Sequence, residues 1–84
     1  MLIYFLLIYQ KEMKLVLLSM ADYGDKRKII SVTGREETKH HLEALGFIEG
    51  EEVTVVSSLS GNLIVNVKGT RIAISRSIAN KIIV

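Results

Sequence analysis

Four side chains that could bind a metal ion lie close together in the sequence: Glu36, Glu37, His40 and His41. Imidazole nitrogens and carboxylate oxygens are common ligands of Fe(II) and other divalent metals. In a helix, each His would lie one turn after a Glu, which pairs Glu36 with His40 and Glu37 with His41. Adjacent helical residues point about 100° apart, so each pair offers two ligands where a specific site uses three or four. We therefore expect mainly a solvated helix face, with at most weak Fe(II) or other divalent-metal binding.

The remaining composition offers little to catalysis. The 84-residue chain has no Cys, which excludes thiol nucleophiles, Cys-ligated zinc and iron–sulfur clusters. No Ser lies in a Gly-x-Ser-x-Gly sequence, and no phosphate-binding Gly-x-x-x-x-Gly-Lys-[Ser/Thr] sequence is present. A chain of this length forms one domain with a modest core. We predict a protein that is not an enzyme and requires no cofactor.

Basic residues gather in one part of the sequence, at Lys26, Arg27, Lys28, Arg35 and Lys39. The net charge of +2 is nevertheless small for a nucleic-acid-binding protein. Small β-barrels that bind RNA also stack bases on aromatic side chains, and only two aromatic residues follow the first nine positions. We expect no nucleic-acid partner, and interpret the basic residues as a solubilising face or a contact for an acidic protein surface.

A single helix must position the His and Glu side chains. The sequence Thr33-Gly34-Arg35-Glu36 fits the Ser/Thr-x-x-Glu capping box that begins many helices. Thr38, Leu42 and Leu45 then recur with helical spacing, and Gly46 follows where a left-handed C-cap is expected. The pattern predicts a helix that begins after Thr33 and ends at Leu45, after which Phe47 and Ile48 turn toward the core.

Short strands account for most of the remaining sequence. Alternating apolar residues between glycine-containing turns indicate strands with one buried face. We expect them over residues 26–32, 52–58, 63–68, 70–74 and 81–84, with hairpin turns over 59–62 and 68–69 and one helical turn over 75–80. The predicted fold class is mostly β with one inserted helix, arranged as a small, partly open β-barrel.

Residues 1–9, MLIYFLLIY, form an unbroken apolar run. It is shorter than the roughly 20 residues of a membrane-spanning helix, and its flanking charges follow it, unlike those of a secretory signal. Three interpretations fit: a leader produced by an early start codon with Met13 as the real start, an additional element covering the core or a partner, or a weak membrane-surface anchor. We divide the chain into an apolar leader over 1–14, which could drive homo-oligomers, and a domain over 15–84.

The order and spacing of motifs in this domain resemble one protein family. The motifs are Tyr23-Gly24-Asp25, Ser31-Val32-Thr33-Gly34, Leu42-x-x-Leu45-Gly46-Phe47-x-x-Gly50, Gly69-x-Arg71-x-Ala73-Ile74 and Ala79-x-x-Ile82-x-Val84. Together they resemble the FeoA family, ferrous iron transport protein A, over about residues 15–84. Glu49 departs from the pattern, since the family usually has Pro at this position.

The resemblance implies an SH3-like small β-barrel with a helix inserted after the first strand. It implies a cytoplasmic accessory protein of ferrous iron uptake, which would meet the inner face of the membrane only through its partner. That partner would be a FeoB-type transporter, which carries a cytosolic GTPase domain. Because the same domain occurs in DtxR-like repressors, a metal-responsive regulatory barrel is the alternative, and an RNA-binding barrel is a third.

Candidate docking residues lie where the predicted helix ends, at Leu45, Phe47 and Glu49. Leu42, Leu45, Phe47 and Ile48 are the main concentration of apolar residues outside the predicted strands and the leader. Packing of the helix onto the barrel would explain most of them. The alternative is that the turn over residues 46–50 borders a surface for the partner protein.

Overall fold

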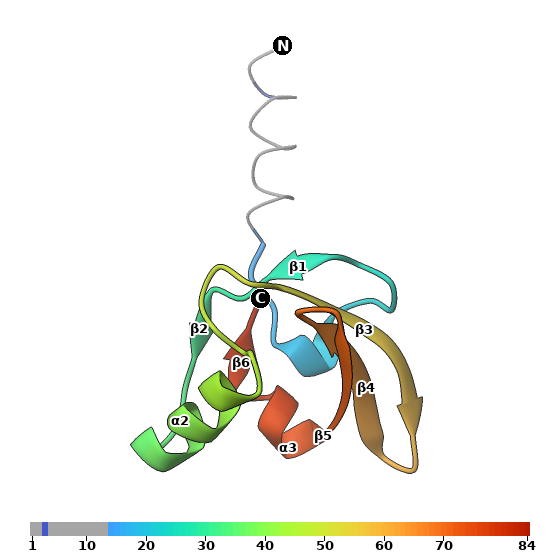
Figure 1. The fold of residues 1–84 in the computed structure, drawn as a ribbon. Coiled ribbons are helices and arrows are strands. Elements are labelled where there is room, and N and C mark those ends of the chain that lie inside the picture. The colour runs from blue at the N-terminus through green and yellow to red at the C-terminus, as the bar shows by residue number, and fades with distance from the viewer. Residues whose placement is uncertain (1–2, 4–13) are drawn as a thin grey trace.

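Six short strands, one nine-residue helix and two helical turns make up the described part of the chain, which is Ile3 and residues 14–84 of a computed structural model (Figure 1). In chain order, the elements are η1 (Leu18–Met20), β1 (Arg27–Lys28), β2 (Ser31–Val32), α2 (Glu36–Ala44), β3 (Glu52–Leu59), β4 (Asn62–Val67), β5 (Thr70–Ser75), α3 (Arg76–Ala79) and β6 (Ile82–Ile83). The apolar leader lies, apart from Ile3 and Lys14, outside the described residues. None of the helices between residues 14 and 84 has the length and apolar character needed to cross a bilayer.

The strands form two antiparallel sheets. The larger sheet has the order β1-β3-β4-β5, and the smaller pairs β2 with β6 (Figure 1). The predicted class, mostly β with one inserted helix, is confirmed. Strand pairing does not join the two sheets into a closed barrel among residues 14–84. Their inner faces instead share one apolar core, to which β2 and β6 contribute Val32 and Ile82.

The prediction of one continuous strand over residues 26–32 is wrong. β1 pairs with β3, whereas β2 pairs with β6, so the chain changes sheets between them. At this corner the Ile29 N–H donates to the Glu51 carbonyl at 2.9 Å, and the Ile30 N–H donates to the Ile83 carbonyl at 2.8 Å. Ile29 is buried and Ile30 is exposed. Two consecutive β-branched residues fit a strand and a corner equally well, so the pattern could not reveal the break.

The long hairpins follow the predicted alternation. The inward side chains of β3 and β4 are the fully buried Val53, Val55, Leu63, Val65 and Val67. The register of β3 shifts after Val55, which indicates a β-bulge. The turn between β4 and β5 has positive φ angles at both Lys68 (50°) and Gly69 (74°). Two such residues favour the tight hairpin that was predicted.

The N-terminus of α2 differs from the predicted capping box. The helix begins at Glu36, and its N-cap residue Arg35 forms no side-chain capping hydrogen bond. The Thr33 hydroxyl instead donates to the Lys81 carbonyl at 3.1 Å. Thr33 therefore extends the β2–β6 pairing, because its backbone N–H also donates to the Lys81 carbonyl, at 2.8 Å. The predicted helical turn over residues 75–80 is confirmed as α3, where the Ile78 N–H donates to the Ser75 hydroxyl at 3.2 Å.

Gly46 ends α2 as predicted, in a backbone conformation that side chains disfavour. Its φ is +105°, and a Cβ atom there would lie 3.5 Å from the Lys68 side chain, an ordinary contact. We expect Gly46→Ala to lower the free energy of unfolding by about 1–3 kcal/mol through backbone strain. Urea denaturation measures this loss, with Glu43→Ala as the exposed control on the same helix, expected within about 0.5 kcal/mol of the parent. Equal stability of both variants would contradict the assigned turn.

Candidate functional site

The predicted docking residues divide between surface and core. Leu45 is 36% exposed and Glu49 is also at the surface, whereas Phe47 is fully buried. The left-handed Gly46 reverses the chain, so that the Phe47 N–H donates to the Leu42 carbonyl at 2.9 Å. The Phe47 ring then enters the core beneath α2. Phe47 is therefore corrected from a candidate contact to a residue that supports the turn from inside.

Ile48 lies at the surface, whereas the sequence predicted that it points into the core. Its side chain is 39% exposed rather than directed into the core. The turn explains this, because the Ile48 N–H donates to the Gly46 carbonyl at 2.9 Å and sends the next side chain outward. Consecutive residues in so tight a turn do not both point inward. The sequence shows only that both residues are apolar, so it did not reveal that Ile48 points outward. Leu45, Ile48 and Glu49 are referred to below as the helix-end surface.

Two depressions flank the helix-end surface. One, of about 300 Å³, is lined by the apolar Val32, Phe47 and Ile48 and by the charged Lys39, Glu43 and Glu49. The other, of about 210 Å³, lies between α2, β5 and α3, and its walls include Leu42, Leu45, Ile74 and Ile78. Apolar walls with charged or polar residues at the rim are typical of surfaces that bind protein side chains.

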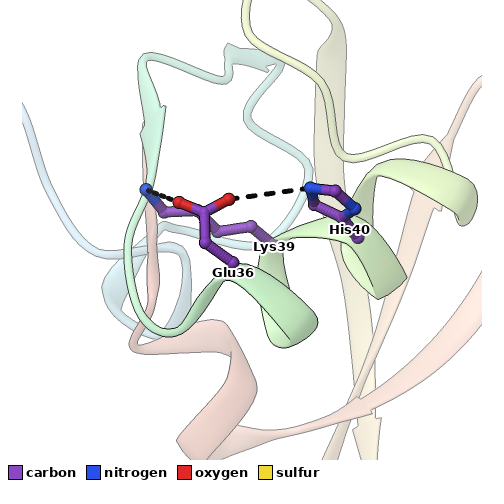
Figure 2. Close-up of polar contacts among 3 residues, drawn as sticks. All are labelled: Glu36, Lys39 and His40. Carbon is purple, nitrogen blue, oxygen red and sulfur yellow. Dashed lines mark ion pairs between the residues drawn. The ribbon is translucent and has the colours of Figure 1, made fainter.

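The predicted metal-ligating residues do not converge. The His40 Nε2 atom lies 3.6 Å from one Glu36 carboxylate oxygen, and the Lys39 Nζ atom lies 4.0 Å from the other (Figure 2). His41 instead lines the 210 Å³ depression. Within residues 14–84 no three His, Asp or Glu side chains form a group that could hold a metal ion. Because Glu36 and His40 are largely exposed, their ion pair contributes little to stability.

The core of the described domain contains only apolar side chains. Every buried residue between positions 14 and 84 is apolar or Gly, with no buried polar or charged side chain. The polar and charged side chains of residues 14–84 therefore lie at or near the surface of the domain.

Comparison with known proteins identifies close structural relatives. The family model for the FeoA domain matches residues 16–84. A crystal structure of an iron uptake regulatory protein (FeoA) is 27% identical, with a TM-score of 0.77, and the match covers 83% of this chain and 95% of that one. Stenotrophomonas maltophilia FeoA complexed with zinc is 29% identical, with a TM-score of 0.70 over 80% of this chain and 86% of that one. That protein is described as a procaryotic SH3 domain protein, possibly a ferrous iron transport activating factor.

A metal-dependent repressor shares the fold at lower identity. A manganese-dependent transcriptional repressor is 14% identical, with a TM-score of 0.75, and the match covers 83% of this chain but 40% of the repressor. At this identity the likeness establishes the fold alone. A search of curated proteins found no match. The SH3-like fold that the resemblance to the FeoA family implied is confirmed by the zinc-bound relative.

Proposed function

We propose, from the premise that this chain belongs to the FeoA family, that it docks through its helix-end surface on the cytosolic GTPase domain of a FeoB-type transporter. The family is linked to ferrous iron transport. Docking would place this accessory protein on the cytoplasmic side of the membrane. The chain would act by binding and contribute no reacting group.

One observation supports this surface above all. The fold leaves Leu45 and Ile48 more than one third exposed, although Leu45 shares a depression with the buried Leu42 and Ile48 follows the buried Phe47. Both side chains border depressions of about 210 and 300 Å³, into which partner side chains could insert. The buried Phe47 fixes the turn between them, so the two aliphatic side chains are held in place before a partner arrives. Binding then costs less conformational entropy.

The proposed mechanism is a shift in the conformational equilibrium of the transporter. A bound protein changes such an equilibrium only by the difference between its affinities for the two states. A GTPase domain alternates between nucleotide-bound forms that differ in its switch segments. The helix-end surface would therefore bind one nucleotide state more tightly than the others.

The direct test is co-purification of the chain with the detergent-solubilised transporter of the same host. We expect the parent chain to co-elute with the transporter in gel filtration. The control for substitutions in the helix-end surface is Leu59→Asp, which replaces a 68% exposed Leu at the end of β3. We expect this variant to co-elute with the transporter as the parent chain does. Elution of the parent chain apart from the transporter in every nucleotide state would contradict docking.

The metal-responsive alternative makes a different prediction. If the module responds to metal, docking requires Fe(II) and is lost when Glu36→Gln and His40→Ala are combined. We expect this double variant to dock as the parent does, because these exposed side chains form one ion pair with a separation of 3.6 Å and face solvent. Titration of Fe(II) under anaerobic conditions, followed by the docking assay, separates the two functions. Docking that depends on added Fe(II) would support the alternative.

A further inference from the structure

A second surface, beside β1, combines basic and exposed apolar side chains. Lys14, Lys26, Lys28, Leu15 and Ile30 line one open depression of about 380 Å³. The three lysines are exposed, and the aliphatic side chains of Leu15 and Ile30 are 55% and 47% exposed. These five residues are referred to as the basic surface. They share no residue with the helix-end surface, although Gly50, which follows Glu49, donates its N–H to the Ile29 carbonyl at 2.8 Å. The helices α2 and α3 lie at the opposite end of the domain from β1 (Figure 1).

Arg27 holds this surface together. Its Nη2 atom donates to the Lys14 carbonyl at 2.7 Å and to the Val84 carbonyl at 3.2 Å. Val16 and Val84 also exchange two backbone hydrogen bonds, of 2.9 and 2.8 Å. Lys14 is thereby fixed beside β1, although 12 positions separate it from Lys26 in the sequence. Lys14, which is distant in the sequence from β1, is therefore part of the basic surface.

The lysines of the basic surface are available to an external anion. The ion pairs formed by residues 14–84 involve Lys39, His40 and Lys68, and none involves a lysine of this surface. Three carboxylates lie beside this surface, and among residues 14–84 none of them forms an ion pair with its lysines. Glu52 is the cross-strand partner of Lys28, and Asp22 and Asp25 line an adjoining depression together with Lys14.

We propose that the basic surface binds an anionic lipid bilayer. Lysines near such a membrane each gain attraction to its negative surface potential, and exposed aliphatic side chains enter the interface. The run MLIYFLLIY, too short to span a bilayer, precedes Lys14 in the sequence and adds further apolar residues to the chain. A basic patch together with an apolar segment gives the two signals that stable membrane association requires. RNA fits less well, because Leu15 and Ile30 provide no stacking platform.

Vesicle sedimentation of the full chain tests this proposal. We expect binding to phosphatidylcholine vesicles that contain phosphatidylglycerol, weakening with salt, and much less binding to phosphatidylcholine alone. Removing all three lysine charges should weaken binding by about a hundredfold, because each charge contributes about fivefold. The test variant carries Lys14→Gln, Lys26→Gln and Lys28→Gln, and the control carries Lys68→Gln, Arg71→Gln and Arg76→Gln. The control loses the same charge elsewhere and is expected to bind as the parent does.

The possible outcomes distinguish membrane binding from the binding of other ligands. The single change Lys26→Gln, at an exposed side chain, should by itself weaken vesicle binding about fivefold without affecting the fold. Equal binding to neutral and anionic vesicles would overturn the proposal, as would full binding by the triple variant. Binding of an oligoribonucleotide through the same lysines, without vesicle binding, would also overturn it and assign the surface to RNA. Transporter docking does not enter this assay, so the two proposals fail independently.

Discussion

Replacing Phe47 with Ala should lower the free energy of unfolding by about 3–5 kcal/mol. Phe47 has the largest side chain among the fully buried residues between positions 14 and 84, and it belongs to the single core cluster. Removing its ring takes away apolar burial and leaves a cavity that the surrounding β-sheets cannot close. Small domains are stable by only about 5–15 kcal/mol, so the variant would lose a large fraction of its stability. The midpoint of urea denaturation, followed by circular dichroism, measures the loss.

The adjacent residue provides the control. Ile48→Ala removes a side chain that is 39% exposed, and we expect it to cost about 1 kcal/mol or less. A similar cost for both substitutions would contradict the assignment of Phe47 to the core and Ile48 to the surface. The two variants also help to interpret a docking experiment. Loss of binding by Phe47→Ala would follow from unfolding and would not show that Phe47 contacts the partner.

Leu45→Asp should weaken docking on the transporter GTPase domain by roughly thirtyfold, the effect of a 2 kcal/mol hot spot. The charged carboxylate would have to lose its water against an apolar partner surface without gaining an ion pair. Because Leu45 is only 36% exposed, its replacement also affects packing within the domain. A thermal melt must therefore accompany the binding measurement. Ile48→Asp, at the more exposed position, provides a second variant of the same surface.

Leu59→Asp is the matched control for both substitutions. It makes the same chemical change as Leu45→Asp at a side chain that is 68% exposed and lies at the end of β3. We expect it to bind the GTPase domain as tightly as the parent chain. If all three variants bind equally well, the helix-end surface is not the docking site. If Leu59→Asp alone binds weakly, the site lies at the β3–β4 hairpin.

The sequence predicted those elements whose signal is periodic. Alternation identified the buried faces of β3 and β4, and the glycine at position 46 marked the end of α2. It did not identify the corner at Ile29–Ile30, because two β-branched residues look the same in a strand and in a turn between sheets. It also assigned Thr33 to a cap, whereas pairing with Lys81 in the smaller sheet holds this residue elsewhere. In both cases, hydrogen bonding to a segment distant in the sequence determined the local structure.

The candidate surfaces were predicted less completely than the fold. Leu45 and Glu49 are exposed as a contact surface requires, but the sequence analysis directed both Phe47 and Ile48 toward the core, and only Phe47 is buried there. The turn geometry after Gly46 determines this difference. The cluster Lys26–Lys28 was visible as a run of charges, whereas its extension to Lys14 depends on the two hydrogen bonds of Arg27. Contacts between distant parts of a chain leave no local pattern to detect.

A fold shared with a manganese-dependent repressor does not transfer that protein's role to this chain. The repressor match rests on 14% identity and covers 40% of the longer protein. What distinguishes the functions is the site that each chain builds on the common fold. Here the helix-end surface places two partly exposed aliphatic side chains, Leu45 and Ile48, beside two depressions, which is why a protein partner is central to the proposed function.

The measurement that tests this central claim most directly is a calorimetric titration of the chain into the GTPase domain of the host's ferrous iron transporter. It is performed without nucleotide, with GDP and with a non-hydrolysable GTP analogue. We predict binding with an affinity that differs by at least about fivefold between nucleotide states, since a regulator must favour one state. Absence of binding in all three states would contradict docking on this domain, and equal affinity in all three would contradict regulation.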